Sequence, residues 1–481
     1  MKKLIVIVFM IFGAFLTLCL YKTFAYDTSV VEEVPSTTDL EYTFKIGNSS
    51  IKQITVDSGE TRYYDIVLGN PNNAKISYSV YYEMVSPSTK PDGYKIEYTS
   101  KSTGNSTGIV NNNGNITLNI VVTNTSSSSV TVKVGTVAGY VKGGELTLNS
   151  GQEVIPKRLT AAEYVMTLND NTSGDEGSGV YKIEHSAIPA SNSATGSEIP
   201  AVTDYRYYGP NPNNYICLDM EGGSTCPDKH LYRIIGSIYE EKENTNRIKL
   251  IKATPLTDGT TSAFSWDYTS SGSYSNIWAT ITSGNYSNSL TSGSTLMQLL
   301  NSGAWWNGTS GSYYNQSNTA TTVNFTNYKL SDKAKSYITT SRYYLGGFNN
   351  TPPLTNEMYG YERGILRYDT NRPLYWEGMV GLMYPSDYGY AAGNSCVNGT
   401  KLYDYNGYGN KDWLYISDIY QSLMSPYSGH FCSLFSVGYA GRVVIDNDVF
   451  EDLAVSPVFY LTSTTSIIDG DGSLNNPYLL K

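Results

Sequence analysis

The sequence predicts a multidomain, mainly β protein in which an immunoglobulin-like β-sandwich precedes an α+β domain. The chain of 481 residues is too long for one ordinary domain, and its 40% of apolar residues can fill more than one core. Tyrosine occurs 44 times against 12 phenylalanines, and tyrosine suits half-buried pleated sheets. Short apolar alternations recur along the chain, and turn-rich segments separate them.

The N-terminus has the pattern of an export signal. Two lysines precede an apolar run from Leu4 to Tyr21, and Thr23-Phe24-Ala25 offers a cleavage site. Residues 1–25 are predicted to be a signal peptide or, if uncleaved, an N-terminal membrane anchor, because the run nearly spans a bilayer. The polar residues 26–39 are predicted to be a linker. We expect an extracellular or cell-surface protein that touches a membrane only through this N-terminal segment.

Residues 40–150 are predicted to form the immunoglobulin-like sandwich. Apolar residues alternate strictly with other residues over 76–84, 116–122 and 130–134, which is the period-two pattern of strands with one buried face. Segments rich in Asn, Ser and Gly separate these runs. Several strands at this spacing over about a hundred residues are typical of such a sandwich.

Residues 151–204 are predicted to hold a short helix and a flexible connector. Thr160-Ala-Ala-Glu163 is a capping box, in which the hydroxyl caps a backbone N–H and the glutamate reaches back. The helix is expected to end by Leu168. The stretch 169–204, rich in Ser, Gly, Asn and Pro, is expected to be loosely structured.

The remaining residues, 205–481, are predicted to be the largest domain. Short helices are expected over 295–300 and, capped by Ser331, over 332–338. The other regular elements are expected to be short strands, which we place at 231–238, 247–253, 443–445 and 455–461.

Charge and cysteine content narrow the class further. The net charge is −10 and the isoelectric point is near 5.0, so nucleic-acid binding is not expected. Four cysteines follow the apolar run, and an even count in an exported chain indicates two disulfides, for which three pairings exist. The local pairing is expected, with Cys217 bonded to Cys226 and Cys396 to Cys432.

Several motifs of this last domain are familiar as a set, namely 205–215, 231–236, 381–390, 412–414 and 475–478. They resemble those of surface proteins from gut Firmicutes and related bacteria, whose C-terminal domain is similar to the C-type-lectin-like fold in its formylglycine-generating-enzyme branch. The resemblance covers more than half of the chain and implies a fold more than an activity. Ser456-Pro457 departs from the pattern, since relatives often have arginine before this proline.

No catalytic residues are predicted. The oxidase that names this branch uses a reactive cysteine pair, and Cys396 and Cys432 are the one remotely suitable pair in the sequence. A structural bridge explains them better in an oxidising compartment. The sequence also contains no Gly-x-Ser-x-Gly motif for a serine nucleophile.

Two sets of candidate binding residues remain. Asp469 and Asp471 are weak calcium candidates in an Asp-Gly-Asp-Gly run, which is more often a tight turn, and no other cofactor is expected. Exposed aromatic rings stack on sugars and peptides, so the candidate ligand contacts are Trp305, Trp306, Tyr343, Tyr344 and, within a tyrosine-rich segment, Asp387. The tryptophans expected in the core instead are Trp278, Trp376 and Trp413.

The function predicted from the sequence is therefore non-catalytic. A signal or anchor leads to a β-sandwich stalk, which presents a lectin-like head for adhesion to a glycan or to a host or surface protein. The alternative is a structural subunit of a fibre or surface layer, which the acidic polar composition fits equally well. An oxidase-type enzyme of the formylglycine-generating branch is the third hypothesis.

Overall fold

The computed structural model describes residues 27–30, 53–100, 108–140, 146–169, 174, 177–280, 290–370, 372–406 and 411–481. The predicted signal or anchor (1–25) and most of the predicted linker (26–39) lie outside these residues. The chain divides into two compact units between Leu159 and Thr160. It is mainly β, with 40% strand and 13% helix, as the sequence predicts. No helix among the described residues is both long and apolar enough to cross a bilayer.

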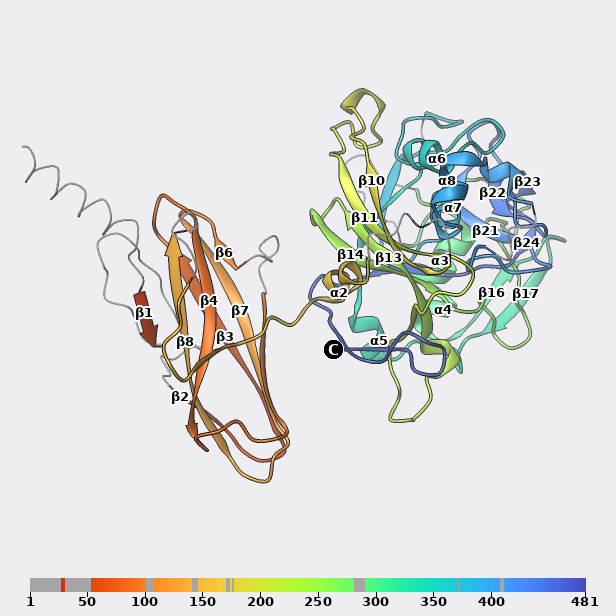
Figure 1. The fold of residues 1–481 in the computed structure, drawn as a ribbon. Coiled ribbons are helices and arrows are strands. Elements are labelled where there is room, and N and C mark those ends of the chain that lie inside the picture. The colour runs from red at the N-terminus through yellow and green to blue at the C-terminus, as the bar shows by residue number, and fades with distance from the viewer. Residues whose placement is uncertain are drawn as a thin grey trace, which may run out of the picture. The chain divides into compact units, whose positions relative to one another are not determined.

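The N-terminal unit contains two antiparallel sheets (Figure 1). One has the order β1-β8-β4-β6, with β2 also paired to β8 and β9 to β4, and the other has the order β3-β7-β5. The strands are β1 Asp27–Val30, β2 Gln53–Val56, β3 Glu60–Asn70, β4 Ile76–Ser86, β5 Tyr94–Ser100, β6 Ile109–Val110, β7 Gly114–Asn124, β8 Val130–Tyr140 and β9 Gln152–Val154.

One apolar core joins these two sheets, and period-two alternation in the sequence creates it. Ile116, Leu118 and Ile120 of β7 are all buried, as are the alternate residues of β4 and β8. Burial of one face on each sheet makes this unit a β-sandwich. The predicted sandwich and its three alternating strands are thereby confirmed, while the immunoglobulin type remains a prediction.

The C-terminal unit is built on a nine-stranded sheet in which β12 and β27 form the one parallel pair between named strands. The order is β18-β25-β14-β13-β12-β27-β26, and β11 joins β13 and carries β10 at its far edge. The strands are β10 Gly179–His185, β11 Val202–Tyr208, β12 Tyr215–Cys217, β13 Leu231–Glu240, β14 Thr245–Lys252, β18 Ile338–Thr339, β25 Val458–Leu461, β26 Ile467–Asp469 and β27 Tyr478–Leu480.

Smaller elements cover this sheet. One of them is a three-stranded sheet of β21 Gln421–Pro426, β22 Ser433–Val437 and β23 Val443–Asp448. Three further sheets have two strands each: β15 Phe264–Ser265 with β24 Asp452–Leu453, β16 Ser310–Tyr314 with β17 Ala320–Asn324, and β19 Ser341–Tyr344 with β20 Tyr375–Gly378. The α-helices are α2 Ala161–Thr167, α3 Thr295–Asn301, α4 Ala304–Asn307, α5 Asp332–Ser336, α6 Thr355–Glu362, α7 Pro385–Ala391 and α8 Asn394–Gly399, and the 3₁₀ turns are 190–192, 228–230 and 402–404.

The predicted helix after Leu159 forms with its capping box. Thr160 accepts from the Glu163 backbone N–H, and the Glu163 carboxylate accepts from the Thr160 N–H. This helix, α2, contacts β13 and β14, so it belongs to the C-terminal unit. The predicted helices over 295–300 and 332–338 form as α3 and α5, each with its serine cap.

The loose connector predicted over 169–204 is wrong. β10 pairs with β11 over seven residues, from Gly179–Tyr208 to His185–Val202, so this stretch extends the main sheet. The C-terminal unit therefore begins near residue 160 rather than at 205. β10 escaped detection because it is an edge strand whose inward residues, Tyr181, Ile183 and His185, are not uniformly apolar.

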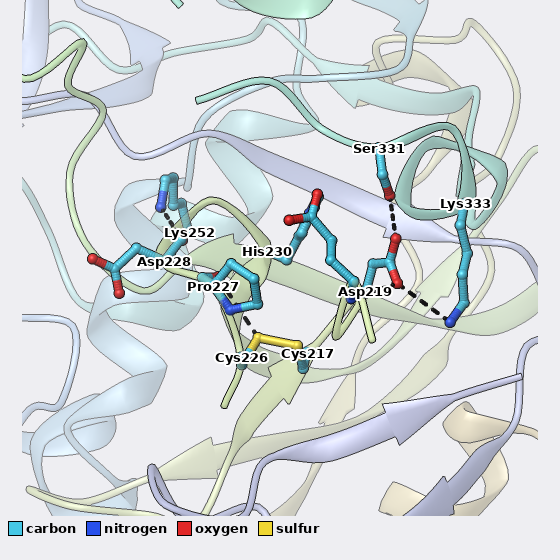
Figure 2. Close-up of a disulfide and its surroundings, with 10 residues drawn as sticks. Cys217, Asp219, Cys226, Pro227, Asp228, His230, Lys252, Ser331 and Lys333 are labelled. Atoms are coloured by element: carbon cyan, nitrogen blue, oxygen red, sulfur yellow. Dashed lines mark hydrogen bonds and ion pairs between the residues drawn. A yellow bond between two sulfur atoms is a disulfide. The ribbon is translucent and has the colours of Figure 1, made fainter. Parts of the chain in front are cut away.

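One of the two predicted disulfides is present. Cys217 at the end of β12 bonds to Cys226 and closes a loop with a sequence separation of 9 (Figure 2). Asp219 in this loop accepts from the Ser331 hydroxyl at 2.6 Å and lies 3.5 Å from the Lys333 ammonium. Ser331 also caps α5, so the closed loop is tied to the start of that helix.

We expect the double variant Cys217→Ser/Cys226→Ser to lower the free energy of unfolding by about 3 kcal/mol. Without the bond, the unfolded chain gains conformational entropy worth about that much for a loop of this length. Urea titration followed by circular dichroism measures the change. Reduction of the unmodified chain should reproduce it. If neither treatment alters the transition, the Asp219 contacts with α5 hold the loop without the bond.

Candidate functional site

The aromatic residues singled out in the sequence are mostly interior. Tyr343 is fully buried, Tyr344 is 4% exposed and Trp305 is 2% exposed, so the prediction that they present rings to a ligand is wrong. Trp305 turns inward because its stretch forms the helix α4, which Gly308 ends with a φ of +63°. Trp306 is half-buried, and the Lys335 ammonium lies 5.0 Å from its ring centroid.

Asp387 lies in a buried network of charges. Its carboxylate accepts from the Arg206 guanidinium at 2.7 Å and from the Lys249 ammonium at 2.5 Å, and all three side chains are almost wholly buried. Arg206 continues to Asp204 at 2.9 Å, and Asp204 to His185 at 3.0 Å. Burial opposes ionisation of Asp387, yet Lys249 and Arg206 together hold the pKa of this carboxyl below its usual value.

The residues predicted around 343–344 and 387 do come together, but as scaffold. The Tyr384 hydroxyl accepts from the Tyr344 backbone N–H at 2.6 Å and donates to the Tyr344 carbonyl at 3.1 Å. The Tyr384 N–H in turn donates to Asp387 at the start of α7. Asp387 is therefore a structural residue that docks α7 onto the sheet, and its prediction as a ligand contact is wrong.

The two calcium candidates lie in the turn that joins β26 to β27. Asp469 accepts from the Gly470 N–H, and Asp471 accepts from the Ser473 N–H at 2.9 Å. These bonds are those of a tight turn. Across the described residues, no group of three or more His, Cys, Asp or Glu side chains is placed to hold a metal ion.

The predicted bond between Cys396 and Cys432 does not form. Cys396 is buried on α8, while the Cys432 sulfur, one residue before β22, lies 3.1 Å from both His430 Nδ1 and Asp448 Oδ1. Burial, reinforced by Asp448, raises the pKa of the Cys432 thiol to about 11. A reactive thiolate needs the opposite shift.

A cleft of about 620 Å³ lies beside α3, α4 and β16, and we call it the hydroxyl cleft. Ten of its sixteen described lining residues are Ser, Thr, Asn or Gln, and none carries a charge. The lining residues are Thr269, Ser270, Thr291, Thr295, Gln298, Leu299, Ser302, Gly303, Ala304, Asn307 and 309–314.

Asp267, just outside the lining, positions two walls of the cleft. One carboxylate oxygen accepts from the Thr295 N–H at the start of α3 at 3.0 Å, and the other accepts from the Ser275 N–H at 2.9 Å. The Thr295 hydroxyl accepts from the Tyr268 N–H at 3.2 Å. Burial raises the pKa of Asp267 to about 6, against the effect of these backbone bonds.

A partly exposed group of rings begins beside the cleft at Tyr268. Tyr268 and Tyr274 contact Phe450, Tyr274 stacks on Phe431 at 6.0 Å between centroids, and the group extends to the ring pair of Phe431 and Tyr368. We call it the aromatic patch; it comprises Tyr268, Tyr274, Tyr368, His430, Phe431 and Phe450. Tyr368 is 52% exposed and Phe431 is 41% exposed, so these rings are available to a ligand.

Neither feature has a clear local signal in the sequence. All but two of the sixteen described cleft residues fall within 291–314, but Ser, Thr and Asn are common throughout the chain, so this segment does not stand out. The patch gathers single rings from distant segments.

Comparison with family models, with curated proteins and with solved structures gave no match. The resemblance to C-type-lectin-like surface proteins therefore remains a prediction from sequence motifs.

Lys249→Met should lower the free energy of unfolding by about 3–5 kcal/mol, because it leaves the buried Asp387 carboxylate with Arg206 as its one cation. Chemical denaturation at neutral pH measures this. The matched control is Lys252→Met on the same strand, whose ammonium donates to the Asp228 carbonyl and pairs with no buried carboxylate among the described residues. Equal losses for the two variants would contradict the role given to Asp387.

Asp267 should make the stability depend on pH. Its folded pKa of about 6 exceeds the ordinary 3.8, so the folded chain holds this proton more tightly than the unfolded chain. The resulting stabilisation is complete below about pH 4 and is lost as the pH rises to about 6, a change of about 3 kcal/mol. Unfolding titrations between pH 4 and 7 should show this loss relative to Asp267→Asn. Parallel curves would contradict the assignment.

Proposed function

We propose that this chain is an exported, surface-exposed binding protein whose C-terminal unit holds a neutral carbohydrate in the hydroxyl cleft. The uncharged lining carries the proposal. Hydroxyl and amide groups both donate and accept hydrogen bonds, which suits the mixed donors and acceptors of sugar hydroxyls. The volume of about 620 Å³ falls in the range of small-ligand pockets.

The uncharged lining and the negative net charge of the chain also disfavour acidic sugars as ligands. Sites for carboxylate, sulfate or phosphate groups usually offer arginine or lysine, and no described residue of the cleft is charged. The whole chain has a net charge of −10, which repels anions at long range. A neutral glycan is therefore the ligand class favoured here.

The aromatic patch supports binding next to the cleft. Its exposed Tyr368 and Phe431 rings offer flat apolar faces of the kind that pack on the C–H faces of pyranose rings. Tyr268 belongs to the patch and its neighbour Thr269 lines the cleft, so one loop contributes to both. A chain of several sugars could use the two surfaces together.

Export and a non-catalytic role rest on separate observations. The apolar run of 4–21 has the pattern of a signal, and the Cys217–Cys226 disulfide suits an oxidising compartment. The raised pKa of Cys432 opposes thiol catalysis. A binding function thus accounts for the hydroxyl cleft and the aromatic patch, whereas the oxidase hypothesis explains neither.

The test is a glycan array probed with the full chain, followed by titration calorimetry on the strongest neutral hit. Ser312→Asp places a carboxylate at the exposed edge of the cleft and should weaken binding at least tenfold, because the charge loses hydration without gaining a partner. Ser317→Asp is the matched control, since it adds the same charge in the turn of the same hairpin, outside the lining.

Binding should persist in chelator, since no carboxylate cluster of the described residues forms a calcium site. Hits confined to sialylated or sulfated glycans, or equal effects of the two serine variants, would refute the proposal. Long ordered assemblies without any glycan binding would instead favour the fibre or surface-layer hypothesis.

A further inference from the structure

A second groove runs along β10, on the opposite edge of the main sheet from β18. It has a volume of about 510 Å³ and shares no lining residue with the hydroxyl cleft. Every residue from 181 to 188 lines one side, and residues of α6, α7 and α8 line the other. Because consecutive residues of a strand line it, the groove follows the backbone edge of β10 rather than one face of the sheet.

The hydrogen bonds of β11 show which backbone groups of β10 face this groove. The Thr203 carbonyl accepts from the Asn246 side chain, and the Tyr207 carbonyl accepts from the Trp413 ring N–H, both on the side of β11 away from β10. Since strand residues alternate, the even residues of β11 bond to β10. The register then pairs Arg206 with Tyr181 and Asp204 with Ile183.

By the same alternation, Lys182 and Glu184 turn their backbone N–H and C=O groups outward into the groove. A bridge to Asn169 occupies the edge at Val180, and β10 pairs with no other named strand of the described residues besides β11. Among the described residues, no strand or bridge occupies the outward edge at Lys182 and Glu184, so these two residues present a hydrogen-bonding template.

The helix side of this groove combines three asparagines with a small apolar cluster, and the rings of that cluster are not open to stacking. Ile183 packs against a small cluster of Tyr359, Tyr390 and Val397. One face of Tyr359 stacks on the His185 ring at 3.7 Å, and the Arg363 guanidinium lies 3.5 Å from its centroid. What the groove offers is therefore a row of backbone groups beside a small apolar cluster, rather than a platform for sugar rings.

We propose that this groove binds an extended segment of another polypeptide, which adds to the sheet as a strand alongside β10. A polypeptide backbone repeats donors and acceptors at the spacing that Lys182 and Glu184 present. Its alternate side chains would lie on the Ile183 and Val397 wall. The others would lie beside the Lys182 and Glu184 side chains, which are 45% and 73% exposed and favour a strand with the opposite order of charges.

The probe is the fluorescein-labelled peptide acetyl-Thr-Val-Lys-Val-Glu-Val-Thr-amide. Laid antiparallel to β10, it places its lysine opposite Glu184, its glutamate opposite Lys182 and valines toward the apolar cluster around Ile183. Fluorescence polarisation with the full chain gives its Kd. Hydrogen exchange resolved by fragmentation mass spectrometry should show at least tenfold slower exchange of the Lys182 and Glu184 amides when the peptide is bound.

Two variants test the geometry. Lys182→Pro removes one outward N–H but no bond to β11, and proline is tolerated at such edge positions; it should raise the Kd at least tenfold, whereas Lys182→Ala should change it less than twofold. Gly360→Leu obstructs the groove from α6, where an added Cβ meets no atom within 4 Å, so it should also raise the Kd at least tenfold without disturbing the fold.

Several results would overturn the proposal. One is the absence of binding at millimolar peptide. Others are binding that Gly360→Leu leaves unchanged, and protection located outside residues 182–186. The melting temperature of each variant distinguishes loss of the fold from loss of the binding site. If Lys182→Pro lowers the melting temperature, Gly360→Leu alone decides the test.

Discussion

The C-terminal unit depends on one buried carboxylate. Asp387 pairs with both Arg206 of β11, which Asp204 also contacts, and Lys249 of β14, and it accepts a hydrogen bond from the Tyr384 backbone N–H at the start of α7. A buried ion without partners is very unfavourable, so α7 has one position in which all three charges are satisfied. That position fixes Tyr384 and, through its two bonds, the strand β19. The wall opposite β10 is thus held from the interior of the domain.

The sequence predicted those parts of the fold that depend on neighbours along the chain. Strict alternation located β4, β7 and β8, and the Thr160 and Ser331 caps located α2 and α5, because each pattern is complete within a dozen residues. β10 was missed because its burial depends on contacts with α6, α7 and α8, far away in sequence. Long-range packing also decided that Cys396 and Cys432 do not meet.

The candidate site was harder to predict for a related reason. Adjacent aromatics such as Tyr343-Tyr344 suggested a surface platform, yet in this tyrosine-rich chain the phenol hydroxyl often serves the interior. Tyr343 donates to a backbone carbonyl and Tyr384 bridges two backbone groups. Exposure is set by the three-dimensional path of the chain. The exposed rings, Tyr368 and Phe431, stand singly in the sequence among polar residues.

The uncharged lining of the hydroxyl cleft has a consequence for the kinetics of association. Without local charges to steer it, a neutral ligand arrives by unassisted diffusion, and the on-rate should be nearly insensitive to ionic strength. Contacts of this kind are individually short-lived. Many copies of the protein on one surface would bind a multivalent ligand durably through avidity, even though each single contact is short-lived. This gain in avidity would be the same at low and at high ionic strength.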